Sequence, residues 1–142
     1  MTDKKTSTMD IKPLEKVVET LRAPGGCPWD RIQTHKTIRQ DLVEEVYEFL
    51  EAVDKEDAAG MREELGDVLL QVVFHAKLAE EEGLFTMQDV INDISNKLIY
   101  RHPHVYGTVE VDSAEQVLKN WDALKAKEKK DRTHVLDGVT QG

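Results

Sequence analysis

Residues 62–79 read REELGDVLLQVVFHAKLA, and this stretch decides the fold. Its middle, residues 68–74, is apolar nearly all round a helix, which is typical of a helix that is buried on most sides. By periodicity alone, the same β-branched and aromatic run is also compatible with a strand. The residues on both sides favour a single helix instead, beginning near Asp57 and running to about Glu82, with Gly83 as its stop.

Four further helices are predicted around this segment, at about residues 10–22, 37–53 and 87–101, and after Ser113. Each carries apolar residues at the spacing of one helix face. Two prolines, Pro24 and Pro28, predict a loop over residues 23–36, and Pro103 ends the helix before it. No convincing hairpin signal is present. We therefore expect an all-α fold, a bundle of about four helices.

Polar residues at the expected helix starts predict three N-terminal caps. Thr37 with Gln40 and Ser113 with Gln116 have the spacing of a capping box, and Thr86 precedes the helix at 87–101.

The length of 142 residues fits one domain, expected at residues 11–130 between a frayed N-terminus (1–10) and a polar tail (131–142). The net charge of −9 argues against a nucleic-acid-binding module. No apolar run approaches the roughly 20 residues needed to span a bilayer. The polar N-terminus and the single cysteine, Cys27, favour a cytoplasmic protein. One helix that is apolar all round in so small a bundle predicts a homodimer or a dimer of dimers.

Two acidic segments carry the candidate chemistry. Residues three apart share a helix face, so Glu45 projects with Glu48, and Glu64 projects with Asp67. Glu44 points about 100° away from Glu45. If the two helices pack antiparallel, four carboxylates converge, and their repulsion calls for a divalent cation. Mg²⁺ suits oxygen ligands and often takes phosphate oxygens too, so a triphosphate is the natural missing ligand.

The competing interpretation of these acids is an ordinary solvated helix face. Two features favour a metal. Glu45 lies at the edge of an apolar stripe, and Asp67 directly precedes the most apolar stretch of the chain. A di-iron Glu-x-x-His pattern, a His-Glu-x-x-His zinc motif and a phosphate-binding glycine loop are all absent from the sequence.

Motifs along residues 11–130 resemble the MazG family of nucleoside triphosphate pyrophosphohydrolases, which belongs to a wider all-α superfamily. The residues that carry the resemblance are Glu44-Glu45-x-x-Glu48, Glu63 to His75, Gly26-Cys27-Pro28-Trp29-Asp30, Arg101 to Gly107, and Trp121 with Lys125 and Glu128. It implies Mg²⁺-dependent cleavage of NTPs or dNTPs between the α- and β-phosphates by a dimeric helical protein. Mn²⁺ is the expected substitute metal. Well-known members carry two copies of the domain, whereas this chain has one.

The resemblance also implies roles for single residues. Glu45, Glu48, Glu64 and Asp67 would bind the metal, with Glu45 also catalytic. Glu44 would be a supporting carboxylate or would orient the nucleophilic water.

Substrate contacts are expected from five residues. Lys97 and Arg101 share a helix face, and Arg suits bidentate phosphate binding, although an ordinary solvated face is the alternative. Lys125 has the support of the resemblance. Trp121 and Trp29 are candidates for stacking on the base, and their alternatives are core packing and loop anchoring respectively.

The sequence thus predicts an NTP pyrophosphohydrolase, plausible as a house-cleaning enzyme for unwanted nucleotides. A narrower dUTP or dCTP pyrophosphatase is the second hypothesis. A helical module that binds a nucleotide or a protein without catalysis is the third.

Overall fold

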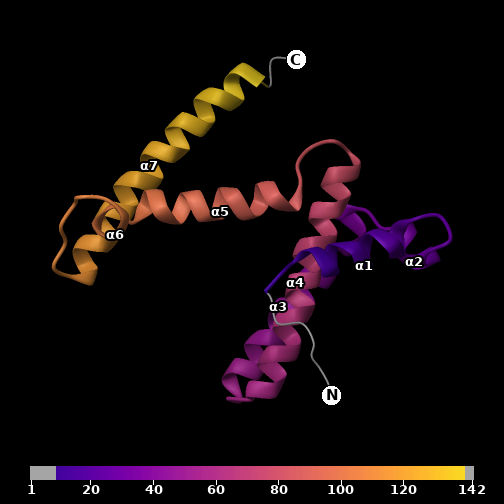
Figure 1. The fold of residues 1–142 in the computed structure, drawn as a ribbon. Coiled ribbons are helices and arrows are strands. Elements are labelled where there is room, and N and C mark those ends of the chain that lie inside the picture. The colour runs from indigo at the N-terminus through magenta and orange to yellow at the C-terminus, as the bar shows by residue number, and fades with distance from the viewer. Residues whose placement is uncertain (1–8, 140–142) are drawn as a thin grey trace. The chain divides into compact units, whose positions relative to one another are not determined.

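The computed structural model describes residues 9–139, and within them side chains as far as residue 130. Seven helices occur there: α1 (Lys12–Arg22), α2 (Pro28–Arg31), α3 (His35–Asp54), α4 (Ala58–Glu81), α5 (Met87–Arg101), α6 (Pro103–Tyr106) and α7 (Ala114–Val139). No strand is found in residues 9–139, so the all-α prediction is confirmed (Figure 1). The chain divides into two compact units, and the boundary between them in the sequence lies between Val90 and Ile91.

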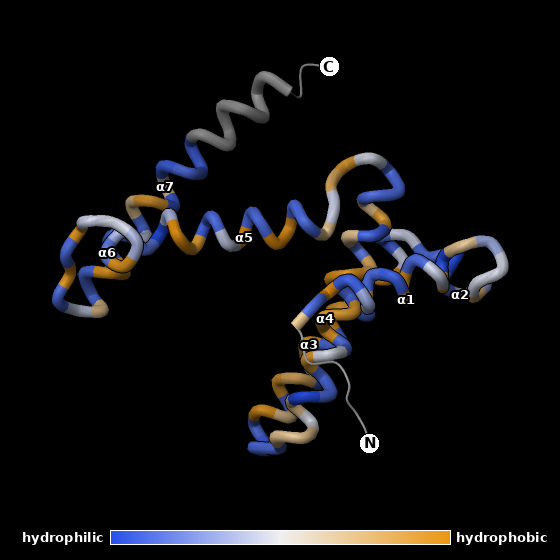
Figure 2. The backbone as a smooth tube through the Cα atoms, viewed as in Figure 1, coloured by the Kyte–Doolittle hydropathy of each residue, from blue (hydrophilic) through white to orange (hydrophobic). Residues whose placement is uncertain are grey.

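In the first unit, α3 and α4 lie side by side and antiparallel, α1 packs on α4, and α2 packs on α1 (Figure 1). The side chains of Val18, Ile38 and Val73 are the largest that are fully buried, and they come from α1, α3 and α4. Apolar residues recur along α3 and α4 (Figure 2). The predicted helix at Asp57–Glu82 is therefore confirmed as α4, with Asp57 as its N-cap accepting from the Gly60 amide at 3.0 Å.

The second unit contains most of α5, together with α6 and α7. Helix α5 has the predicted bounds, and its cap is confirmed, because Asp89 N donates to Thr86 Oγ1 at 3.2 Å. At the start of α7, Gln116 N donates to Ser113 Oγ at 3.2 Å, which is one half of the predicted box. Helix α7 continues past residue 130 to Val139. Residues 1–8 and 140–142, on which parts of the predicted termini fall, lie outside the described residues.

Two local predictions are wrong. Residues 28–31 form the short helix α2 rather than a loop, because Pro28 occupies its first turn, where no backbone N–H is needed. Pro103 likewise begins α6. The cap of α3 is Thr34 rather than Thr37. Thr34 accepts from Thr37 N at 3.3 Å, and the Thr37 hydroxyl accepts from Thr34 N at 2.8 Å.

Among the described helices, none combines the length and the apolar character that crossing a membrane requires.

Candidate metal centre on α3 and α4

The antiparallel pairing of α3 and α4 brings the predicted carboxylates together. One carboxylate oxygen from each of Glu45, Glu48 and Glu64 lies within 4.8 Å of the other two. Asp67 belongs to a second group of three, in which one of its carboxylate oxygens lies within 4.8 Å of oxygens of Glu63 and Glu64. The four predicted carboxylates therefore fall into two overlapping groups of three, which share Glu64. Glu63 is an additional member that the i, i+3 pattern does not select.

Electrostatics within this cluster favour protonation in the absence of a cation. Burial, a hydrogen bond with Asp67 and the charge of Glu48 raise the pKa of Glu64 to about 7. Burial and then the charge of Asp67 raise the pKa of Glu45. Both shifts have the sign expected for carboxylates that are withdrawn from water and held near one another.

The cluster also contains two carboxylate oxygens that could act as metal ligands. Glu45 Oε2 and Glu64 Oε1 are buried and have no hydrogen-bond partner in the structure. A buried acceptor without a partner costs about 1–3 kcal/mol, and more for a charged group. Mg²⁺ or Mn²⁺ would take such oxygens as ligands, so these residues fit a divalent cation. Glu44 is exposed and outside this group, although its charge contributes to the raised pKa of Glu45.

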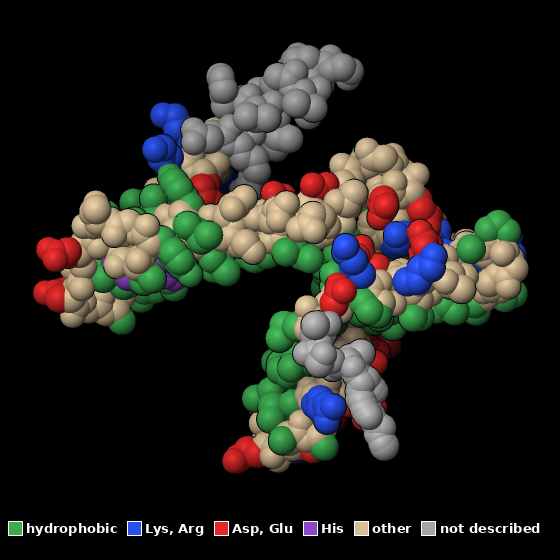
Figure 3. Space-filling view, in the orientation of Figure 1, with side chains coloured by type: hydrophobic (Ala, Val, Ile, Leu, Met, Phe, Trp, Pro, Cys, Tyr) green, Lys and Arg blue, Asp and Glu red, His purple; other side chains and the backbone are tan. Residues whose placement is uncertain are grey.

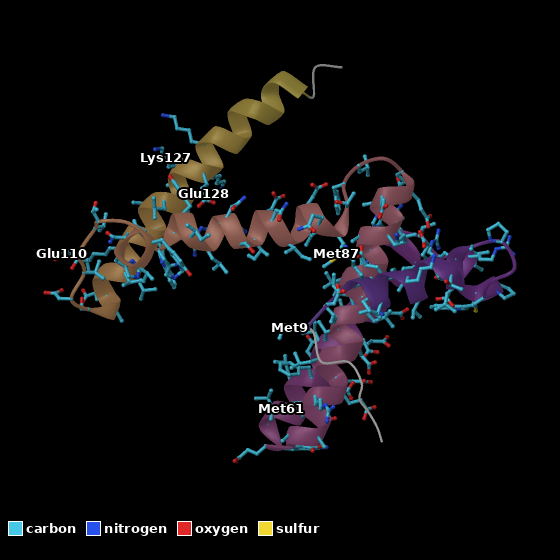
Figure 4. The ribbon with its side chains drawn as sticks, viewed as in Figure 1. Met9, Met61, Met87, Glu110, Lys127 and Glu128 are labelled. Atoms are coloured by element: carbon cyan, nitrogen blue, oxygen red, sulfur yellow. The ribbon has the colours of Figure 1, made fainter. Side chains whose placement is uncertain are left out.

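Four of the predicted substrate-binding residues belong to the second unit. Arg101 donates from Nε and Nη2 to the two carboxylate oxygens of Glu128, at 2.9 and 3.0 Å. Lys97 lines a hollow of about 470 Å³ together with Tyr100 and Glu128, and Figure 4 marks Glu128 on α7. Lys125 is exposed. In this structure the guanidinium of Arg101 is thus already paired with the carboxylate of Glu128.

The two tryptophans have different surroundings. Trp121 packs in an edge contact against His102, with ring centroids 5.1 Å apart, and its Nε1 is buried without a partner. Trp29 lies on α2 with a 55% exposed side chain, and its carbonyl accepts from Gln33 Nε2 at 2.8 Å. Neither residue belongs to α3 or α4, which carry the carboxylates.

Sequence reasoning missed two polar features of α3 and α4. His35 Nδ1 and His75 Nδ1 lie 2.8 Å apart, and burial followed by the charge of His35 lowers the pKa of His75. Gln71 has a buried Oε1 without a partner. One signal for Gln71 was available, because it is the single polar residue in the apolar run 68–74.

The sequence of this helix pair matches a known protein family. Residues 33–106 match the MazG nucleotide pyrophosphohydrolase domain, a span that covers α3 to α6 and all four predicted metal ligands. Lys97 and Arg101 also fall inside the match, whereas Trp29, Trp121 and Lys125 fall outside it.

Curated relatives show similarity over most of this chain. A nucleoside triphosphate pyrophosphohydrolase/pyrophosphatase MazG of Thermotoga maritima is 53% identical over 84% of this chain and 45% of its own length. A nucleoside triphosphate pyrophosphohydrolase of Escherichia coli (strain K12) is 44% identical over 84% of this chain and 46% of its own. The protein YabN of Bacillus subtilis is 48% identical over 92% of this chain and 27% of its own. The chain thus spans less than half the length of these relatives.

A solved structure is similar in fold. The crystal structure of a mazG-related protein from Thermotoga maritima matches with a TM-score of 0.67 and 28% identity, covering 81% of this chain and 98% of that one.

Proposed function

Because this chain belongs to the MazG nucleotide pyrophosphohydrolase domain family, we propose that it hydrolyses nucleoside triphosphates to a nucleoside monophosphate and pyrophosphate in the presence of Mg²⁺. The observation that carries the proposal is the carboxylate cluster of α3 and α4, in which two buried oxygens have no partner. Such a cluster is poorly suited to a purely structural role, since like charges in a shared site repel one another.

In this proposal, Glu45, Glu48, Glu64 and Asp67 hold the cation. When bound, it would neutralise phosphate charge, polarise the phosphoryl group and lower the pKa of an attacking water. Glu45 is proposed to be catalytic as well, and the charges of Asp67 and Glu48 both help to raise its pKa. Glu44, exposed beside it, supports the cluster or orients the water. The proposed biological role is the removal of unwanted nucleotides from the cytoplasmic pool.

Five further residues keep the substrate-binding role that the sequence predicts for them, namely Lys97, Arg101, Lys125, Trp121 and Trp29. Lys97 and Lys125 offer ammonium groups for phosphate oxygens, and Trp121 and Trp29 offer faces for the base. The ion pair of Arg101 with Glu128 holds the guanidinium in a fixed orientation, and phosphate binding would need part of this fork to be released from Glu128.

A homodimer is also part of the proposal. Large apolar side chains stay exposed on α3 and α4, including Val46 (39%), Leu50 (46%), Leu65 (51%) and Leu69 (41%). Figure 3 shows hydrophobic side chains gathered along one side of this helix pair. A second copy of the chain would cover them, which is the usual explanation for an apolar helix face of this extent.

The activity is tested by incubating the protein with each NTP and dNTP, with and without Mg²⁺, and measuring pyrophosphate. We expect release only with Mg²⁺. The substitutions Glu48→Gln and Asp67→Asn should each lower the rate at least about 100-fold, because each removes a direct ligand. Glu51→Gln is the matched control, since Glu51 lies on the same helix and outside the cluster. No pyrophosphate from any nucleotide would rule out both enzyme hypotheses and leave the binding module.

A further inference from the structure

We infer that Gln71 binds the nucleoside part of the substrate and helps to determine which nucleotides are accepted. This inference rests on the proposed function and adds a specificity-determining residue to it. The group recognised is a hydrogen-bond donor, because the atom that lacks a partner is the acceptor Oε1.

The position of Gln71 on α4 relates it to the carboxylates. It follows Asp67 by four residues and Glu64 by seven, so the three side chains share one face of the helix. With a rise of about 1.5 Å per residue, Gln71 lies about 6 Å beyond Asp67 and about 10 Å beyond Glu64 along the helix axis. Direct ligation of Mg²⁺ would need an oxygen at about 2.0–2.1 Å. The offset instead suits the sugar and base that extend from a phosphate held at the cluster.

The state of Gln71 also calls for a ligand. It interrupts an apolar run in which Val73 and Phe74 are buried. An amide oxygen that is buried there without a hydrogen bond costs about 1–3 kcal/mol relative to a satisfied one. An apolar side chain of the same size would avoid that cost, so the amide is expected to be useful in a bound state.

A second copy of the chain is a less suitable partner for this amide. At about 100° per residue, Gln71 lies only about 20° from Glu64 around the helix. The exposed apolar residues Leu65 and Leu69 lie about 100° and 140° from Glu64. The surface proposed to meet the second copy therefore faces away from Gln71, which shares the direction of the carboxylates.

The test uses Gln71→Met, which keeps the length of the side chain and removes the amide, with Gln71→Leu as a second variant. Gln40→Met is the matched control, since Gln40 is exposed on α3. Calorimetry measures the binding of α,β-methylene analogues of the NTPs and dNTPs in Mg²⁺. Both Gln71 variants should weaken analogue binding roughly tenfold, the effect of losing about one hydrogen bond. Their affinities for Mg²⁺ and for inorganic pyrophosphate should stay unchanged.

Measuring kcat/KM for each NTP and dNTP identifies the group of the nucleotide that donates the hydrogen bond to Gln71. Loss of discrimination between NTPs and dNTPs identifies a ribose hydroxyl, and loss of discrimination between bases identifies a base N–H. Unchanged analogue affinity and an unchanged substrate ranking in both variants would overturn the inference while leaving the proposed function intact. A loss of affinity for Mg²⁺ or pyrophosphate as large as the loss for the analogues would also overturn it, because it would place Gln71 at the metal. A changed dimer dissociation constant in the variants would overturn it as well. Failure of the wild-type protein to bind any analogue would overturn both proposals.

Discussion

At Glu64, burial and neighbouring carboxylates hold the pKa at about 7, well above the usual 4.5 of a glutamate. A carboxyl whose folded pKa is raised binds its proton more tightly in the folded state. Its contribution to the free energy of unfolding is therefore complete below the unfolded pKa and is lost as the pH rises through 7. In EDTA, we expect the stability of the wild-type protein relative to Glu64→Gln to fall between pH 5 and pH 8, measured by urea unfolding.

The glutamine variant serves as the reference because it mimics the protonated form and does not titrate. Glu51→Gln is the control for replacing a surface carboxylate on the same helix pair, since Glu51 belongs to neither carboxylate group. A wild-type stability that rises with pH relative to Glu64→Gln would contradict the raised pKa. The same protonation should make Mg²⁺ binding weaker at pH 6 than at pH 8, because the ligand must lose its proton first.

Single residues differ in how far the sequence reveals them. The grouping of the carboxylates proposed as metal ligands was predictable within each helix, because i, i+3 spacing fixes a shared face. The contact of His35 with His75 joins residues 40 positions apart, and only the register of α3 against α4 creates it. The pairing of Arg101 with Glu128 is similar, since it depends on how α5 meets α7. Contacts of this kind are properties of packing rather than of spacing.

At the scale of helices, Arg22 connects α1 with α4 and with the segment around α2. Its Nε and Nη2 donate to the Glu81 carboxylate, each at 2.7 Å, and Nη1 donates to the carbonyls of Asp30 and Gln33. We expect Glu81→Gln to lower the free energy of unfolding by about 1 kcal/mol at pH 7, since Glu81 is partly exposed to solvent. Urea unfolding measures this change. Arg22→Ala should cost more, about 2–3 kcal/mol, because it also leaves two carbonyls without their donor.

The pH dependence of this pair has the opposite sign to that of Glu64. The hydrogen bond and charge of Arg22 lower the pKa of Glu81. The stabilisation is therefore present above the unfolded pKa of Glu81 and is lost as the pH falls through its lower folded value. The difference in stability between wild type and Glu81→Gln should therefore shrink as the pH is lowered and the Glu81 carboxylate becomes protonated. Glu51→Gln, from an exposed pair with Lys55, should change stability little at either pH, and an equal loss in both variants would argue against this interpretation.

The boundaries of the helices also differ in how far the sequence alone predicts them. The long helices were predictable from apolar periodicity, and α5 has the predicted bounds. The one-turn helices α2 and α6 are too short to have a period, and their prolines were interpreted as breakers although Pro28 and Pro103 begin them. For α3, a threonine three residues before the predicted cap performs that role. Capping signals in neighbouring turns compete, and sequence spacing alone does not choose between them.

At the scale of the whole molecule, the first unit presents two different surfaces along the same helices. On α3, Val46 and Leu50 lie about 100° and 140° from Glu45 around the helix, and α4 repeats this separation between Glu64 and its exposed leucines. The proposed metal ligands and these exposed apolar residues therefore point in different directions around each helix. This arrangement allows one side to be covered by a second chain while the other still receives substrate.

The oligomeric state provides the last prediction. We expect the wild-type protein to sediment as a homodimer, and the single substitutions Leu50→Asp and Leu69→Asp each to raise its dissociation constant at least about 100-fold, because a carboxylate buried in an apolar interface costs about 3 kcal/mol or more. Sedimentation velocity over a range of concentrations measures the constant. The control is Ile32→Asp, which places the same charge at a 73% exposed position at the end of α2. A monomeric wild type, or dissociation constants that shift equally in all three variants, would show that the apolar side of α3 and α4 is not the interface.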